Sequence, residues 1–181
     1  MDNSRFDECM NRIRGGDKEA LKEIYESCQE YIFHLMYSIT GNYSDAEDLS
    51  VEFFLKLWDI ADKYTPGGGY RRWLTVIARN LALDFLRRNQ REIALEAENI
   101  EQELEKHSGD DPGYEKVLDD ISIEQALAGL SPAEREIVHL KVAGELTFQN
   151  IADILKVPMG TVTWRYRQAV GKLRRCGYEA L

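Results

Sequence analysis

The segment KVPMGTVTWRYRQAVGKLRR, residues 156–175, points to the fold of the chain's C-terminal part. It follows a short apolar stretch, FQNIADIL (148–155), and turns at a Pro158–Gly160 corner into a longer basic stretch. A helix of about eight residues, a short turn and a longer helix of different character form a helix-turn-helix pattern. The apolar residues expected to hold the two helices together are Ile151, Ala152, Leu155, Val157, Val162, Tyr166, Ala169 and Leu173.

This packing would leave the polar side of the second helix facing outward. The candidate DNA-contacting residues are Thr161, Thr163, Trp164, Arg165, Arg167, Gln168, Lys172 and Arg175. Arginine pairs with guanine and glutamine with adenine in a major groove, while threonine and aromatic groups suit the thymine methyl. The basic side chains near the end of the helix would contact DNA phosphates. The alternative is a two-helix packing unit with a solvated basic face.

Helix signals continue through the rest of the chain, which is expected to be all-α. Asp17 can cap a helix over residues 18–40, and a Ser44–Glu47 capping box opens a second helix that runs to about residue 60. The proline and three glycines of residues 63–70 predict a loop, after which helical spacing resumes at Arg71. A second capping box at residues 131–134 and a Thr147 cap begin the last helices.

Charge divides the chain into three parts. The whole chain has 181 residues, 44% of them hydrophobic, and a net charge of −9. Residues 91–122 hold 11 acidic and 3 basic side chains, whereas residues 123–181 hold 6 acidic and 8 basic ones. We therefore predict two small helical domains, residues 1–90 and 117–181, joined by a flexible acidic linker over residues 91–116.

Several classes of protein are disfavoured by what the sequence lacks. No apolar run approaches the ~20 residues of a membrane span and no secretory signal begins the chain, so a cytoplasmic protein is expected. Three cysteines and three histidines are scattered without ligand spacing. No nucleophile set or phosphate loop is present, so we expect no catalytic residue, metal or cofactor. The carboxylates Asp45, Asp48 and Glu52 are expected to form a solvated or protein-docking face rather than a metal site.

A second basic patch combines arginines with aromatic residues. Its candidate residues are Tyr64, Tyr70, Arg71, Arg72, Trp73, Asn80, Asp84, Arg87 and Arg88. Aromatic and basic side chains beside a glycine loop suit unstacked single-stranded DNA, and an amide and a carboxylate one turn apart suit the edge of a flipped base. The alternative is that Trp73 belongs to the core and the arginines are solvated.

These segments resemble the extracytoplasmic-function (ECF) sigma factors of bacterial RNA polymerase, within the sigma-70 family. SDAEDLSVEFFLKLW (44–58) and YRRWLTVIARNLALDFLRR (70–88) are similar to their second region, and residues 127–175 to their fourth. Such a member would bind core polymerase through the clamp coiled coil and the flap, recognise and melt the −10 element, and read the −35 element of promoter DNA. An anti-sigma factor is a further implied partner, and neither a small-molecule substrate nor direct membrane insertion is implied.

The resemblance also assigns roles to residues. The helix carrying Asp45, Asp48, Glu52, Phe53 and Lys56 would dock on the clamp, and the second basic patch would act at the −10 element. Val51 stands where the family usually has glutamine. Thr163 stands where the family usually has lysine or arginine, and Trp164 where it usually has a small polar residue.

Two other functions compete with this one. A free-standing helix-turn-helix regulator would bind duplex DNA without polymerase, and an adaptor would bind only proteins. The paired basic patches argue against the adaptor, and the helical segments provide no evident dimer interface or effector pocket for the regulator.

Overall fold

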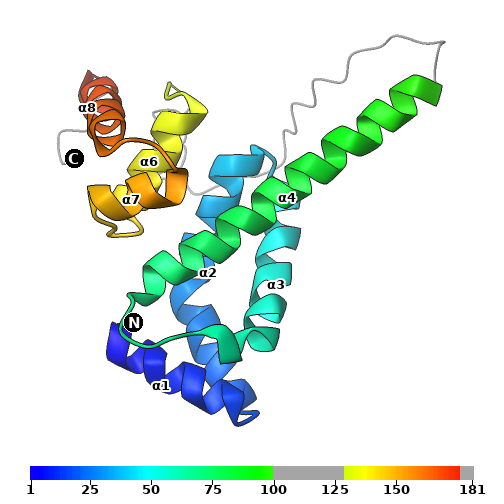
Figure 1. Cartoon of the computed structure of the whole chain (residues 1–181), viewed down its shortest axis with the longest axis vertical. Coiled ribbons are helices and arrows are strands. Elements are labelled where there is room, and N and C mark those ends of the chain that lie inside the picture. Colours follow the sequence, from blue (N-terminus) through cyan, green and yellow to red (C-terminus); the bar gives the residue numbers. More distant parts are fainter. Residues whose placement is uncertain (100–128, 176–181) are drawn as a thin grey trace.

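The computed structural model describes residues 1–99 and 129–175, which are helical with no strand (Figure 1). The prediction of an all-α chain is confirmed. In order, the elements are α1 (Asn3–Arg14), α2 (Lys18–Thr40), α3 (Tyr43–Asp59), a 3-10 turn η1 (Ala61–Lys63), α4 (Tyr70–Asn99), α6 (Pro132–Val142), α7 (Phe148–Leu155) and α8 (Met159–Arg175). The first five form an N-terminal unit, residues 1–99, and the last three a C-terminal unit, residues 129–175.

Side-chain caps begin most of these helices. The capping box between Ser131 and Glu134 is present at the start of α6, and Thr147 caps α7. Asp17 caps α2 by accepting the Glu19 amide. The expected Ser44 cap of α3 is wrong: Asn42 accepts the Asp45 amide at 3.0 Å, so the helix starts one residue earlier than Ser44.

Helix α1 is an element that sequence analysis missed. Its buried residues Phe6, Cys9, Met10 and Ile13 follow the i, i+3, i+4, i+7 spacing of an amphipathic helix. This signal is visible in the sequence, but the mixed charges around it obscure it. Because α1 covers one end of α2 and the 64–70 loop, it determines what that loop can expose.

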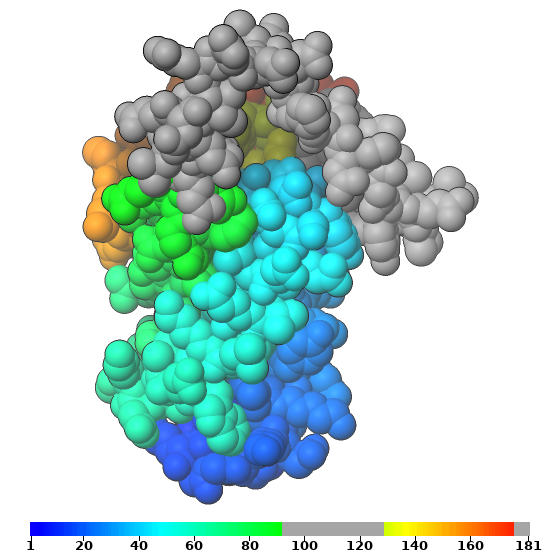
Figure 2. Space-filling view, turned by 90° about the vertical axis from the view of Figure 1, so that its right-hand side faces the viewer, coloured from blue at the N-terminus to red at the C-terminus, as the bar shows by residue number. Residues whose placement is uncertain are grey.

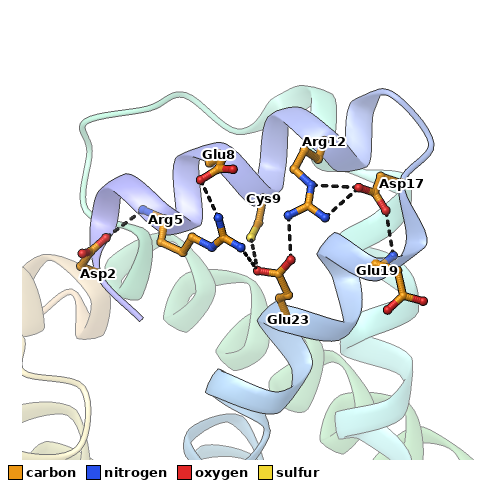
Figure 3. A network of polar contacts seen from close by, with 8 residues as sticks. All are labelled: Asp2, Arg5, Glu8, Cys9, Arg12, Asp17, Glu19 and Glu23. Carbon is orange, nitrogen blue, oxygen red and sulfur yellow. Dashed lines mark hydrogen bonds and ion pairs between the residues drawn. The ribbon is translucent and has the colours of Figure 1, made fainter.

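Ion pairs fasten α1 to α2 (Figure 3). The Glu23 carboxylate accepts from Arg12 at 2.7 Å and from Arg5 at 2.5 Å, and Arg12 also pairs with the α2 cap Asp17. Hydrogen bonds from Arg12 and then Arg5 lower the pKa of Glu23, and the bond from Arg12 lowers that of Asp17. The network therefore stabilises the fold above the ordinary carboxyl pKa values and weakens as pH falls below them.

Helix α4 is longer than the sequence suggests. It continues to Asn99, whereas the linker was expected to begin at residue 91. The boundary at residue 90 therefore falls inside a helix, whose C-terminal end extends past the other helices in Figure 1. The remainder of the expected linker and the first residues of the expected second domain lie outside the described residues.

The two units pack against each other. Helix α6 lies along α2, and one continuous apolar cluster includes Ile32 and Leu35 of the N-terminal unit together with Ile137 and Leu140 of the C-terminal unit. Figure 1 shows α6 and α7 beside α2 and the first half of α4. The sequence predicts the two units but not this contact between them.

Candidate nucleic-acid and polymerase interfaces

Helix α8 presents an exposed stripe that fits a groove of DNA. Trp164, Arg167, Gln168 and Arg175 are exposed and recur at helical spacing, and Trp164 retains 60% of its accessible surface. The opposite side is buried through Val162, Ala169 and Leu173, as predicted from the helix-turn-helix pattern. The stripe combines hydrogen-bonding and apolar groups of the kinds that distinguish bases in a major groove.

The other predicted DNA-contacting residues of α8 are less exposed. Thr161, Thr163 and Arg165 are half-buried, and the Thr163 hydroxyl donates to the Gly160 carbonyl at 3.0 Å. Thr161 lies on the same side of α8 as Trp164 and Gln168, three and seven residues before them, whereas Thr163 and Arg165 lie at the edges of the stripe.

Lys172 has a structural contact within the C-terminal unit. Its ammonium lies 2.7 Å from the buried carboxylate of Glu134, which also accepts from the Ser131 amide and hydroxyl. The lysine hydrogen bond is the main reason that the pKa of Glu134 is lowered. The ion pair therefore fixes α8 on the first turn of α6, so the expected phosphate contact would compete with it.

Helix α4 carries a second exposed stripe. Arg72, Asn80, Asp84 and Arg87 are exposed on one side of the helix, and Asp84 accepts from Arg87 at 3.1 Å. Val76 lies between Arg72 and Asn80 on this side and is also exposed. Val76 is not among the residues predicted for this patch, although its i, i+4 spacing from both neighbours is visible in the sequence. Arg88 is exposed as well.

Tyr64 in the loop before α4 and Tyr70 at the first residue of α4 are core residues, which corrects the expectation that they present a stacking face. Tyr64 and Tyr70 each keep 4% of their surface, because both pack on Phe6 of α1. The Tyr64 hydroxyl donates to Asp7 at 2.5 Å, and the Tyr70 hydroxyl donates to the Met1 carbonyl at 2.7 Å. Burial raises the pKa of both phenols. Trp73 is half-buried in the same cluster, at 4.9 Å from Tyr64 between ring centroids.

Arg71 of this patch is turned toward the C-terminal unit. Its guanidinium donates to the Ala143 carbonyl at the end of α6 at 2.6 Å. The polar side chains left on the surface of the expected −10 patch therefore come from α4 itself rather than from the loop before it.

Helix α3 has an exposed face that combines acidic and apolar residues. Asp48, Glu52 and Lys56 are exposed there, and Asp45 is half-buried. Val51 and Leu55, which keep 55% and 63% of their surfaces, lie beside Asp48 and Glu52 on this face. Figure 2 shows this side of the molecule, with α3 in cyan facing the viewer. Two exposed aliphatic side chains one turn apart, flanked by charges, are typical of a protein-docking surface.

Phe53 does not belong to this face. Its side chain is fully buried on the opposite side of α3, which corrects its assignment as a polymerase contact. The acidic residues Asp48 and Glu52 are on the surface as predicted. The apolar residue predicted for the same face, Phe53, is not on it. Leu55, not Phe53, is the exposed large apolar residue.

No group of His, Cys, Asp and Glu side chains in residues 1–99 and 129–175 is arranged to hold a metal ion. None of the helices in these ranges combines the length and apolar character that crossing a membrane requires.

Comparison with solved structures finds the same fold in sigma factors. RpoE of Bartonella quintana, solved with the anti-sigma factor NepR, matches 88% of this chain and 98% of its own with a TM-score of 0.65 at 22% identity. CnrH, solved with the cytosolic domain of CnrY, matches 99% of this chain and all of its own with a TM-score of 0.61 at 19% identity. At these identities the likeness concerns the fold.

Sequence comparisons point to the same family. The chain is 29% identical to the ECF RNA polymerase sigma factor SigW of Bacillus subtilis over 92% of its length and 93% of the relative. It is 31% identical to SigE of Mycolicibacterium smegmatis over 88% of its length and 63% of that protein. The family profiles Sigma-70 region 2 and Sigma-70, region 4 match residues 24–92 and 126–175. With both regions present in order and nearly full-length similarity to SigW, the chain belongs to the extracytoplasmic-function sigma factors of the sigma-70 family.

Proposed function

We propose that this protein is an alternative sigma factor, which binds core RNA polymerase and directs it to a promoter through −35 and −10 elements. One observation carries the proposal: a single chain presents three separate surfaces. Two are stripes suited to nucleic acid, on α4 and on α8, and the third is a protein-docking face on α3. A free-standing regulator needs only the α8 stripe. A sigma factor also needs a surface for the polymerase, which the α3 face would supply, and a surface for an opened DNA strand, which the α4 stripe would supply.

The proposed division of labour follows from the chemistry of each stripe. Trp164, Arg167 and Gln168 of α8 would contact base edges of the −35 element, while Arg175 would contact phosphate. Val76 and Asn80 of α4 would meet an unstacked base of the −10 element, where an apolar surface beside an amide suits a flipped base. The protein supplies binding and nucleates strand opening, and the polymerase supplies the catalysis. This role places the protein with the DNA, in the cytoplasm.

Leu55→Asp should abolish or strongly weaken capture of core polymerase, because it replaces the exposed aliphatic centre of the α3 face with a charge. Asp48→Arg should act in the same direction by reversing a charge beside it. A hot-spot residue near the centre of a docking surface costs about 2 kcal/mol or more when it is lost, which is about 30-fold in affinity. Pull-down of core enzyme and run-off transcription from genomic DNA measure both effects.

Lys18→Asp provides a matched control, because Lys18 is an exposed residue at the start of α2, away from the α3 face. It should retain both polymerase capture and transcription. Transcripts that appear without core enzyme, or wild-type capture by Leu55→Asp, would contradict the docking assignment. A footprint at duplex sites in the absence of core polymerase would instead favour the free-standing regulator.

We extend the proposal to a separate protein inhibitor. Two sigma factors of the same fold, RpoE and CnrH, were each solved with an anti-sigma factor or the cytosolic domain of a partner protein. Purification from uninduced native cells should recover the chain with a second protein besides polymerase. Recovery with polymerase alone would contradict this extension.

A further inference from the structure

Helix α1 contacts both ends of the loop that leads into α4. At the first end, the Arg14 Nε donates to the Ala61 carbonyl at 3.1 Å, and the same guanidinium donates to the Tyr64 carbonyl. The Tyr64 hydroxyl in turn donates to Asp7 of α1. Three hydrogen bonds with one helix therefore fix the chain where it leaves the 3-10 turn η1.

Residues 1–3 fix the second end of the loop. The Asn3 side-chain oxygen accepts from the Tyr70 amide at 3.3 Å, and the Met1 carbonyl accepts from the Tyr70 hydroxyl. Tyr70 is the first residue of α4, so its amide has no acceptor within its own helix and Asn3 supplies one. The Phe6 ring connects the two ends, because it packs on both Tyr64 and Tyr70.

Between these fixed ends lies a tip, Thr65-Pro66-Gly67-Gly68-Gly69, that carries few side-chain atoms. Its first four residues are exposed and its last is half-buried. Gly67 and Gly69 have φ angles of 85° and 80°, which favour glycine, so the shape of the tip itself requires a bare backbone. The amides of the three glycines donate to no other group among the described residues. A ligand can therefore approach this backbone closely and accept from its amides.

We propose that α1 acts as a brace, which holds the tip preformed next to the start of α4 so that the tip and the α4 stripe contact the opened strand of promoter DNA together. The inference rests on the proposed function, because that function assigns the α4 stripe to the opened strand. A backbone amide can donate to a base edge or to a phosphate oxygen, and a bare backbone leaves room for an unstacked base. Arg14 and Asn3 are positioning residues, since they contact the ends of the loop and not the DNA.

The physical advantage of a brace is entropic. Every residue that must be ordered on binding lowers the affinity, and glycine loses more conformational freedom than any other residue. A tip with three successive glycines would therefore bind a strand weakly if its ends were free. Fixing both ends confines the tip before the strand arrives, so that less freedom is lost on binding. The contacts that fix the ends come from α1 and place no side chain on the tip.

Arg14 and Arg12 of α1 form a matched pair for the test. Arg12 pairs with Glu23 and Asp17 at 2.7 and 2.8 Å (Figure 3), and none of its hydrogen bonds or ion pairs within residues 1–99 reaches the loop. Arg14→Ala and Arg12→Ala each remove one positive charge and charge-assisted contacts of α1, so both should lower the melting temperature. Only Arg14→Ala releases an end of the loop.

Binding is measured in the full-length chain without polymerase, by anisotropy of a fluorescein-labelled single strand of about 20 nucleotides and mixed sequence. We expect Arg14→Ala and Asn3→Ala to bind the strand about five-fold more weakly and to exchange the amide hydrogens of residues 61–70 faster. Asn3→Asp keeps an acceptor for the Tyr70 amide and should bind within two-fold of the wild type. Arg12→Ala should also stay within two-fold, as should the binding of all these variants to a duplex of the same sequence, which the α8 stripe would contact.

A variant of the tip tests the contact with DNA separately from the brace. A Cβ added to Gly68 would lie 3.9 Å from the Thr65 carbonyl oxygen, which is an ordinary contact distance, so Gly68→Leu fits the loop and covers its backbone. We expect this variant to bind the single strand about five-fold more weakly while hydrogen exchange in residues 61–70 stays unchanged.

The brace is overturned if Arg14→Ala binds the strand as tightly as the wild type, if Arg12→Ala loses as much affinity, or if Gly68→Leu has no effect. Failure of the wild-type chain to bind the strand would overturn it as well. Polymerase takes no part in these measurements, whereas the proposed function is tested by run-off transcription with core enzyme. A chain that meets every expectation here but supports no transcription would contradict the sigma-factor role and leave the brace intact.

Discussion

Phe6→Ala should lower the free energy of unfolding by about 3–5 kcal/mol, the usual cost of truncating a buried phenylalanine. Phe6 is fully buried and lies at the centre of an aromatic cluster, with ring centroids 4.6 Å from Tyr70 and 5.2 Å from Tyr64. Its loss leaves a cavity and also removes aromatic contacts worth about 0.5–1.5 kcal/mol per pair. Urea unfolding followed by circular dichroism measures the change.

The matched control is Leu55→Ala, which truncates an exposed apolar side chain and should change stability by no more than about 0.5 kcal/mol. A small effect of Phe6→Ala, below 1 kcal/mol, would mean that α1 does not support the 64–70 loop. The result bears on function because the cluster holds Tyr64 and Tyr70 inside the fold. With a stable cluster, strand opening depends on the exposed stripe of α4 rather than on these rings.

Lowering the pH from 7.5 to 5 should favour separation of the two units about 30-fold, because His139 must be neutral where α6 packs on α2. Burial first, and then the nearby His34, lowers the pKa of His139 from 6.5 to about 4, while its bond to the Tyr31 carbonyl opposes the shift. The His139 Nε2–H donates to that carbonyl at 3.2 Å, since the carbonyl can only accept. Tyr31 and His34 face the ring from α2, and the Arg79–Glu136 pair lies one turn along α6.

The sign follows from a His139 pKa that is lower while the two units are packed together than when they are apart. The packed arrangement binds fewer protons, so its stabilisation is complete above pH 6.5 and is lost as pH falls from 6.5 toward 4. The distance between spin labels at Lys22→Cys and Gln168→Cys, in a chain with Cys176→Ser, measures the separation, because Cys9 and Cys28 are buried. His139→Phe keeps an aromatic ring for Tyr31 and should remove most of the pH dependence, whereas His34→Phe should leave the larger part. An interdomain distance that is the same at both pH values would contradict this prediction.

Local sequence determined the helices and the family. The helix-turn-helix at residues 148–175, the Ser131 capping box and the loop before Tyr70 follow from turn residues and apolar spacing, which act over a few residues. The same short-range pattern correctly placed Trp164, Arg167 and Gln168 on the exposed side of α8. Helix α1 could have been found in the same way, because its four buried residues are regularly spaced.

Tertiary structure alone decided which predicted site residues remain available. An aromatic residue beside arginines has the same sequence pattern whether it stacks on a base or packs in a core, and only the presence of α1 buries Tyr64 and Tyr70. The side of α3 that packs against α2 is likewise set by the tertiary structure, which exposes Leu55 and buries Phe53. Glu136 and Arg79 are 57 residues apart, and such a pairing arises only when the two units pack. Local propensity acts within a helical turn, whereas burial and interdomain pairing depend on surfaces that distant segments bring together.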